Sequence, residues 1–134
     1  MKENHKYFSN LAFNLAETNL GNTKKNPSVG CVIVKNQSVI SSGITSNNGR
    51  PHAEFIALNK KMNFNGSIMY VTLEPCTHFG LTPPCTNIIR KKNVKKVFYS
   101  FYDPDKRTYK KAKKVLKNVI KNNKIENKYK DFYK

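Results

Sequence analysis

The sequence contains little cysteine, no tryptophan and few acidic residues. Its 134 residues include three cysteines, and 8 Asp and Glu stand against 25 Lys and Arg, which gives a formal net charge of +17. Three cysteines are too few for a disulfide-stapled secreted domain, which usually has an even and denser set. No run approaches the ~18 consecutive apolar residues of a membrane-spanning helix, and Asn10, Asn14 and Glu17 interrupt the N-terminal stretch where a signal peptide would be apolar. We therefore expect a cytoplasmic protein of one domain with free thiols.

The positive charge is concentrated toward the end of the chain. From Arg90 to Lys134 there are 17 basic and 4 acidic residues, and lysine outnumbers arginine 22 to 3 in the whole sequence. Such an excess is typical of a solvated surface or of a protein with an acidic partner. We identify no aromatic cluster interleaved with these lysines as a base-stacking platform. The sequence thus predicts weak, non-specific binding of nucleic acid and no membrane partner.

Apolar periodicity predicts a series of helices and strands. Apolar residues recur every three or four positions over residues 8–16, and Gly21 follows as a helix stop. β-branched residues predict strands over 29–34 and from 39 onward, joined as a hairpin by the turn at 35–38. Beyond the hairpin we expect helices over 52–62, 84–92 and 109–120, and strands over 68–73 and 97–101.

This order predicts a layered α/β fold with a mixed sheet. A hairpin is antiparallel, whereas strands joined by helical crossovers are usually parallel. We expect one folded domain over residues 1–122, followed by a loosely held, basic polar tail over residues 123–134.

Three short segments together predict a metal site. His52 and Glu54 stand at the start of a predicted helix, Pro75-Cys76 follows a strand, and Cys85 opens the next helix. Each segment alone is weak evidence, because lone histidines and cysteines are more often surface or core residues. Together they supply two thiolates and one imidazole, a known catalytic zinc set that leaves a fourth position for water. Such a site lowers the pKa of bound water toward neutrality, and Glu54 is close enough to carry its proton without ligating the metal.

The other cysteine and an N-terminal histidine are interpreted structurally. Cys31 lies inside an apolar strand and is predicted to be a core thiol. His5, in the polar first turn, is predicted to be a surface residue rather than a ligand. The zinc ligands are therefore predicted to be His52, Cys76 and Cys85.

The motifs resemble one particular family. His-x-Glu followed by Pro-Cys and a further Cys is the pattern of zinc-dependent nucleobase deaminases. The segments 26–34 (NPSVGCVIV), 52–54 (HAE) and 70–85 (YVTLEPCTHFGLTPPC) resemble the deaminase domain of riboflavin biosynthesis, which acts on diaminohydroxyphosphoribosylaminopyrimidine and is often fused to a reductase. The resemblance covers about residues 7–116, and the loop between the two cysteines is its most specific part.

The resemblance implies a three-layer α/β/α fold of the cytidine deaminase type. It implies Zn²⁺ as cofactor, Glu54 as the catalytic proton shuttle, and substrate contacts from Asn26, His78 and Asp103. Locally, each of those three polar residues is equally consistent with capping or loop stabilisation. Glu74 belongs to the pattern without an assigned role and is interpreted as a supporting loop residue. The implied partners are a phosphorylated pyrimidine, a second copy of the chain and a separate reductase polypeptide.

Three positions depart from the family pattern. Thr45 stands where the family usually has a histidine, Leu81 where it has Lys or Arg, and Asp105 where it has Asn. All three lie where the substrate would be held, whereas the metal motif is intact. The leading hypothesis is a stand-alone deaminase of the riboflavin pathway. Two alternatives remain open: a related zinc deaminase of another nucleobase, nucleoside or tRNA adenosine, and a non-catalytic subunit that keeps zinc for folding.

Overall fold

A computed structural model of the chain describes residues 4–122, 125 and 127–134 and contains one five-stranded mixed sheet. The strands are β1 (Gly30–Lys35), β2 (Ser38–Ile44), β3 (Ile68–Leu73), β4 (Lys96–Phe101) and β5 (Val119–Lys121), in the spatial order β2-β1-β3-β4-β5. β1 pairs antiparallel with β2 and β3, whereas β3–β4 and β4–β5 are parallel. The predicted hairpin and the predicted parallel pairing of the later strands are confirmed.

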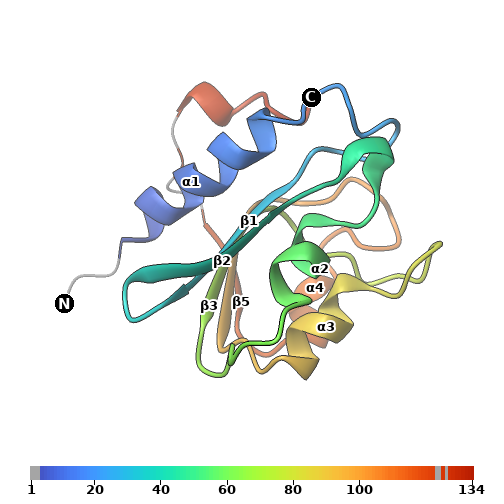
Figure 1. Cartoon of the computed structure of the whole chain (residues 1–134). Helices are drawn as coiled ribbons and strands as arrows, with labels where there is room; N and C mark the ends of the chain where they lie inside the picture. The colour runs from blue at the N-terminus through green and yellow to red at the C-terminus, as the bar shows by residue number, and fades with distance from the viewer. Residues whose placement is uncertain (1–3, 123–124, 126) are drawn as a thin grey trace.

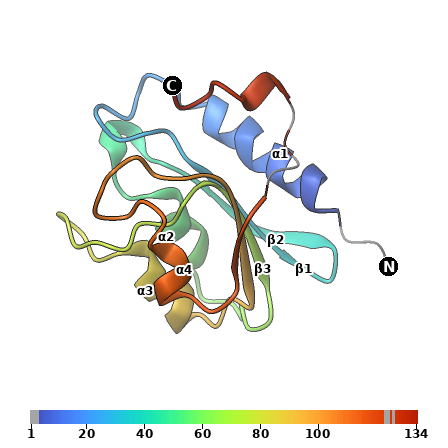
Figure 2. The same ribbon diagram turned by 180° about the vertical axis from the view of Figure 1, so that it is seen from behind.

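Helices cover both faces of the sheet. Figures 1 and 2 show α1 (His5–Glu17) on one face, and α2 (Ala53–Leu58), α3 (Cys85–Lys91) and α4 (Ala112–Val115) on the other. The three-layer fold implied by the resemblance is therefore confirmed. Among the described residues, no helix is long and apolar enough to cross a membrane.

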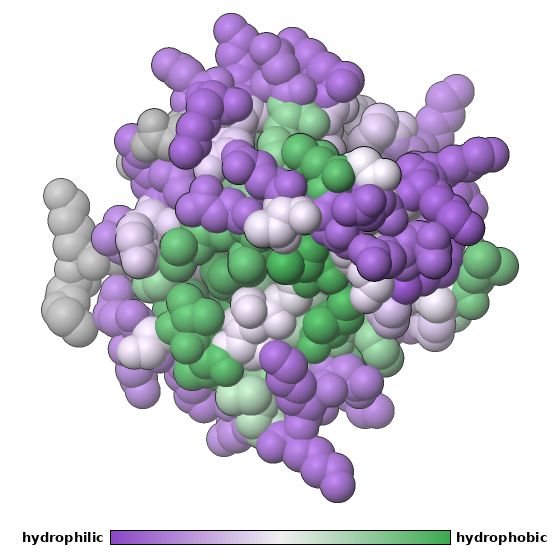
Figure 3. Space-filling model, turned by 45° about the horizontal axis from the view of Figure 1, so that its top comes forward, coloured by the Kyte–Doolittle hydropathy of each residue, from purple (hydrophilic) through white to green (hydrophobic). Residues whose placement is uncertain are grey.

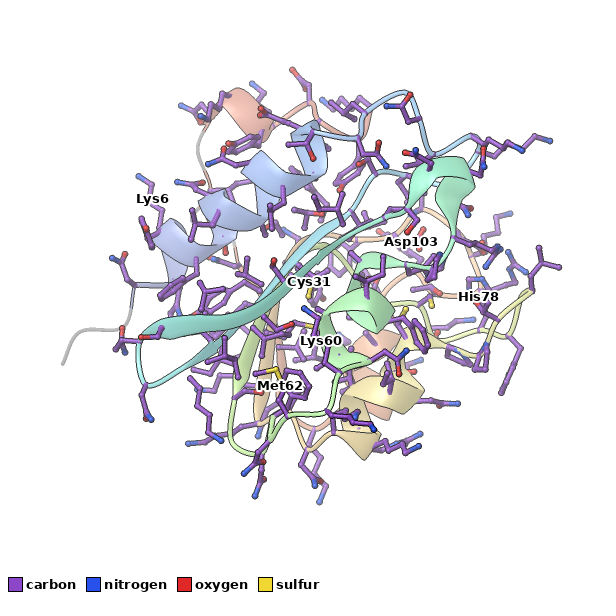
Figure 4. All side chains as sticks on the ribbon, viewed as in Figure 1. Lys6, Cys31, Lys60, Met62, His78 and Asp103 are labelled. Atoms are coloured by element: carbon purple, nitrogen blue, oxygen red, sulfur yellow. The ribbon has the colours of Figure 1, made fainter. Side chains whose placement is uncertain are left out.

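The two apolar cores follow the two-residue period of the strands. In β1, Cys31 and Ile33 point to the core beneath α2 and α3, whereas Val32 and Val34 point to the core beneath α1. Cys31 is fully buried, which confirms its prediction as a core residue. Figure 4 shows its side chain between the sheet and the α2 layer. On the α1 side, His5 is half-buried and its Nδ1 lies 2.5 Å from the hydroxyl of Tyr70, so it is a packed residue rather than the expected surface one.

Two glycines allow helices to approach the sheet closely. A Cβ at Gly43 in β2 would lie 2.2 Å from the carbonyl oxygen of Ala53, in the first turn of α2. A Cβ at Gly30 in β1 would lie 1.9 Å from the carbonyl oxygen of Ala12 in α1. Because any larger residue at position 43 would push α2 away, this glycine fixes the height of His52 and Glu54 above the sheet.

The predicted last helix is wrong over most of its length. Only the four residues of α4 are helical; Leu116 is already extended, and Val119–Lys121 forms β5, parallel to β4. Apolar residues at 115, 116, 119 and 120 fit a helical stripe, but β-branched Val119 and Ile120 also suit a strand, and pairing with β4 decides between the two. The predicted helix over 52–62 is similarly shorter, because Asn59 leaves the helical conformation with φ −83° and ψ 62°.

The predicted loose tail differs most from the structure. Residues 123, 124 and 126 lie outside the described part, but Tyr129 is 1% exposed and its ring stacks on Phe13 of α1 at 4.4 Å. Phe132 and Tyr133 extend this aromatic cluster. The lysine-rich composition of the segment conceals these aromatic anchors, and their burial against α1 holds its last residues on the molecule.

One face of the molecule is hydrophilic around its rim and apolar near its centre. Figure 3 shows polar residues around most of the visible face and apolar residues gathered near its centre. The large apolar side chains that remain exposed in the β2–α2 region are Val39, Phe55 and Met62, each about 40% exposed or slightly more. Scattered exposed apolar residues of this kind are common on folded proteins.

Candidate functional site

The three predicted metal ligands converge at the start of α2 and α3. His52 is the residue before α2, Cys85 is the first residue of α3, and Cys76 lies in the loop that leaves β3. One donor atom from each lies within 4.8 Å of the others. Nδ1 of His52 is 3.8 Å from Sγ of Cys76 and 3.5 Å from Sγ of Cys85. Residues 33 positions apart in the chain thus present one imidazole and two thiols to the same point.

The donor set fits zinc. Both cysteines are buried and form no disulfide. Hydrogen bonding from Cys85, opposed by burial and aided by His52, lowers the pKa of Cys76 to about 4, so this sulfur is a thiolate at neutral pH. The hydrogen bond to Cys76 and then burial raise the pKa of Cys85 instead. A cation would favour the second thiolate as well, because metal binding displaces thiol protons.

Glu54 lies at the floor of the site, in the first turn of α2. Its side chain is 4% exposed. Burial, followed by the nearby charge of Cys76, raises the pKa of this carboxyl to about 7. A carboxyl of that pKa exchanges protons near neutral pH, which is what general acid–base catalysis requires.

One cavity of about 610 Å³ connects the metal site with the three predicted substrate contacts. His52, Glu54 and Cys76 line its floor, and Asn26, His78 and Asp103 line it as well. Figure 4 labels His78 and Asp103, which lie on the side of α2 where the helix begins. The structure therefore brings all the predicted site residues together, while their roles toward a substrate stay predictions.

The three polar residues also make hydrogen bonds within the protein. Nδ2 of Asn26 donates to the carbonyl oxygen of Gly49 (2.9 Å), and Nδ1 of His78 lies 2.8 Å from Oγ1 of Thr108. Oδ1 of Asp103 accepts from the backbone N–H of Asp105 (3.0 Å). Asn26 and His78 are thus fixed by neighbouring loops and Asp103 by its own, and Nε2 of His78 lies 3.9 Å from Oδ2 of Asp105.

Glu74 is the residue whose importance the sequence did not reveal. It is 2% exposed, and its carboxylate accepts from three backbone N–H groups: Asp103 (3.3 Å), Lys110 (3.0 Å) and Ala112 (3.0 Å). These bonds tie the loop of residues 103–112 to the end of β3. The glutamate directly before the Pro-Cys motif was the available signal, and its partners lie 29 to 38 positions away in the chain, beyond the reach of a local pattern.

The three departures surround the cavity mouth. Thr45 is 1% exposed and its Oγ1 accepts from the N–H of Val29 (2.9 Å), so it leaves this wall without a charge. Asp105 forms a two-point ion pair with Arg107, with Nη2 to Oδ2 at 2.7 Å and Nε to Oδ1 at 3.0 Å, and this pairing lowers the pKa of Asp105 below its usual value. The side chains of Thr45 and Asp105 therefore both have hydrogen-bonding partners within the protein.

Near Leu81, the third departure, a cation is supplied by another residue, Arg50. Leu81 is 86% exposed at the loop tip and brings no charge to the mouth. Arg50, two residues before His52, lines the cavity and donates from Nη1 to Oγ1 of Thr82 (3.2 Å). Its guanidinium thus lies across the loop at residues 80–82, beside the position where the family pattern has Lys or Arg.

The charge of Arg50 also reaches the metal site. Hydrogen bonding to Cys76 raises the pKa of His52, whereas burial and then the charge of Arg50 act in the opposite direction. A histidine ligand must be neutral to bind a metal. The influence of Arg50 on His52 is small beside that of Cys76, so its main place is at the mouth of the cavity.

The family can now be identified from sequence comparison. A model of the cytidine and deoxycytidylate deaminase zinc-binding region matches residues 2–101, a span that holds His52, Glu54, Cys76 and Cys85. The chain belongs to this deaminase family. Its cofactor, as for the family region, is zinc, and His52, Cys76 and Cys85 are positioned to bind it.

Within the deaminase family the similarity is to riboflavin-biosynthesis proteins. RibD of Aquifex aeolicus is 42% identical over 106 residues, 78% of this chain and 30% of the relative. The diaminohydroxyphosphoribosylamino-pyrimidine deaminase of Buchnera aphidicola subsp. Schizaphis graminum is 36% identical and covers 96% of this chain and 93% of the relative. The solved RibD of Acinetobacter baumannii superposes with a TM-score of 0.81 at 40% identity, over 90% of this chain and 34% of that one. The chain thus spans about a third of the length of these RibD proteins.

Proposed function

We propose that the protein catalyses the zinc-dependent hydrolytic deamination of diaminohydroxyphosphoribosylaminopyrimidine. The observation that carries this proposal is a buried carboxyl, Glu54, beside the His52, Cys76 and Cys85 donors at the floor of one cavity. Similarity to the Buchnera diaminohydroxyphosphoribosylamino-pyrimidine deaminase along nearly its whole length supports the substrate. A cytoplasmic location, where thiols stay reduced, is part of the proposal because two of the ligands are thiols.

The reaction exchanges an amino group for a carbonyl oxygen. One water is consumed, the C–N bond to the ring carbon breaks, a C=O bond forms and ammonia leaves. Zinc, when bound, supplies Lewis-acid polarisation and a water of lowered pKa. Glu54 accepts the proton of that water, delivers it to the ring nitrogen next to the reacting carbon, and then transfers a proton to the departing amine. Its burial and its pKa of about 7 suit both directions of transfer.

The walls of the cavity suit a polar ring with an anionic arm. Asn26, His78 and Asp103 offer an amide, an imidazole and a carboxyl to the ring. Lys24, Lys25 and Arg50 line the same cavity and would attract a phosphate at its mouth. The alternative of a non-catalytic zinc subunit gives no reason for a carboxyl buried beside the metal donors, because structural zinc needs no proton carrier.

An ammonia-release assay tests the proposal. The zinc-loaded protein is supplied with the phosphoribosyl pyrimidine and, in parallel, with cytidine, adenosine and guanine. We expect release only from the phosphoribosyl pyrimidine. Release from cytidine or adenosine instead would move the chain to another substrate class, and no release from any of them by a protein holding one zinc would support the non-catalytic alternative.

A further inference from the structure

Tyr133 lies in the predicted tail but lines the cavity of the metal site. Phe132 and Lys134 line it too, beside Glu54 and Cys76 on the floor. The family region ends at residue 101, so the motif pattern provides no role for this wall. From the sequence, residues 123–134 are predicted to be a loosely held, basic tail, without a role at the site.

The hydroxyl of Tyr133 joins two elements of the site. It donates to the carbonyl oxygen of Ser28 (2.6 Å) and lies 2.6 Å from Oγ1 of Thr72 in β3. Because the single proton of the Tyr133 hydroxyl is donated to Ser28, the Thr72 hydroxyl donates to Tyr133, and Oγ1 of Thr72 accepts from the N–H of Gly30 (3.2 Å). A continuous chain of hydrogen bonds therefore runs from Gly30 through Thr72 and Tyr133 to Ser28.

The two joined elements both carry site residues. Ser28 is two residues after Asn26, the predicted substrate contact on the loop before β1. Thr72 is four residues before the ligand Cys76, in the strand that leads to it. The ring of Tyr133 is held in place by edge-on contacts with Phe101 (5.8 Å) and Phe132 (4.8 Å). The phenol is thus fixed between the loop that presents Asn26 and the strand that presents the metal site.

We propose that Tyr133 is a positioning residue for substrate, which sets the distance between the Asn26 loop and the zinc-bearing floor and closes one wall of the cavity. This inference rests on the proposed deaminase function for its kinetic readout. Without the hydroxyl, the carbonyl of Ser28 loses its partner and the loop relaxes away from β3. Substrate binding weakens, while the ligands and Glu54 stay in place because the phenol's hydrogen bonds in the described structure go to Ser28 and Thr72 and to none of these residues.

Tyr129 provides a matched control in the same segment. Its hydroxyl also makes a hydrogen bond, to Oδ1 of Asn14 (2.6 Å), and its ring is buried against Phe13. Tyr129 does not line the cavity. Tyr129→Phe and Tyr133→Phe therefore both keep the ring and remove a phenolic hydroxyl, and each lowers stability by a comparable amount. Only Tyr133→Phe disturbs the site.

The experiment compares the two variants with the wild-type chain. For Tyr133→Phe we expect KM for the phosphoribosyl pyrimidine to rise roughly five- to tenfold, with kcat within about twofold and one zinc retained. Tyr129→Phe keeps the wild-type KM. A deletion of residues 132–134 raises KM further. If the deletion does not fold, the comparison of the two point variants still decides the question.

A second readout is independent of turnover. Hydrogen exchange of the backbone amides of Asn26 and of residues 28–30 speeds up in Tyr133→Phe and not in Tyr129→Phe. If both variants change KM equally, or if neither KM nor exchange changes in Tyr133→Phe, the positioning role is wrong. A wild-type protein without turnover contradicts the proposed function alone, because the exchange comparison still tests the role of Tyr133.

Discussion

The floor and the mouth of the cavity differ in how closely they follow the deaminase pattern. At the floor and its metal site, the cavity-lining His52, Glu54 and Cys76 and the adjoining Cys85 all match, and every one is buried or half-buried. At the mouth, Thr45, Leu81 and Asp105 depart from it. The floor carries out bond chemistry that is common to the family, so its donors cannot be exchanged. The mouth only has to hold a substrate, and several arrangements of side chains can supply the same attraction.

The departures at the mouth are balanced by residues from other elements. Arg50 brings a guanidinium to the loop at residues 80–82, where Leu81 brings no charge. Arg107 neutralises Asp105. Glu74 fixes the loop that carries Asp103 through three backbone N–H groups. Compared position by position, the sequence lacks family residues at the mouth. In the folded protein, Arg50 still supplies a cation there and Glu74 still holds the loop that carries Asp103.

The largest effect is expected at the floor, from Glu54→Gln. Glutamine keeps the shape and one hydrogen-bonding oxygen but cannot carry the proton, so turnover falls by ~10²–10⁴-fold. Zinc content stays at one per chain, measured by metal analysis alongside ammonia release. Glu17→Gln, an exposed change at the end of α1, serves as the control and keeps wild-type turnover. Wild-type turnover in Glu54→Gln would show that another group moves the proton.

The next effect concerns zinc and stability. Cys85→Ala removes a ligand and loses most of the metal, whereas Cys31→Ala, a change at a buried thiol in the core, keeps it. Bound zinc stabilises the fold by about 2.7 kcal/mol when free zinc is about 100 times its Kd. EDTA therefore lowers the melting temperature of the wild type and of Cys31→Ala but leaves that of Cys85→Ala unchanged. Equal chelator sensitivity of the two variants would contradict the ligand assignment.

The contrast between the floor and the mouth of the cavity also explains which parts of the site could be predicted from the sequence. The zinc donors could be predicted because each lies at the end of a strand or the start of a helix, and because one histidine with two cysteines is a known zinc-ligand set. Cys31 was assigned to the core because its neighbours Val32 and Ile33 are apolar. Glu74 was left without a role because its three partners lie in a loop about thirty residues later, a pairing that only the fold creates.

The wrong predictions have a common physical origin. Apolar residues between 109 and 120 fit helical spacing, yet β4 offers an unpaired edge that Val119–Lys121 fills as a strand. Tyr129 and Tyr133 lie among lysines, so composition indicates a solvated tail, although their rings pack on Phe13 and Phe101. In both cases a tertiary partner outweighs the local preference.

A moderate effect is expected at the mouth, from Arg50→Gln. Loss of the guanidinium weakens attraction to the phosphate arm, so KM rises roughly tenfold, equivalent to about 1.4 kcal/mol, with kcat unchanged. Arg107→Gln is the matched control, because Arg107 lines the same cavity but is already paired with Asp105. Adding Leu81→Lys to Arg50→Gln restores the lower KM. If the two arginine variants raise KM equally, Arg50 has no special role.

The smallest effect concerns a surface where lysines and aromatic rings meet, contrary to the sequence prediction of no such cluster. The rings of Tyr102 and Tyr109 lie 5.4 Å apart, and Nζ of Lys110 is 5.1 Å and 5.3 Å from their centroids. Nζ of Lys121 is 5.5 Å from Tyr102. Tyr109 is 46% exposed. Exposed aromatic faces with cations beside them can stack on single-stranded bases without reading sequence.

We therefore expect weak binding of single-stranded RNA that depends on this patch. Because this binding rests on a few phosphate contacts, raising the salt concentration from about 50 to 200 mM lowers the affinity roughly tenfold or more. Tyr109→Ala weakens binding roughly fivefold at the lower salt, because it removes one stacking face. Deaminase turnover stays unchanged, since the Tyr109 side chain does not line the described cavity. Fluorescence titration with a labelled oligonucleotide measures the change. Tight binding to one tRNA that persists at about 200 mM salt would instead make the mouth and this patch parts of one nucleic-acid surface, and would favour the tRNA deaminase alternative.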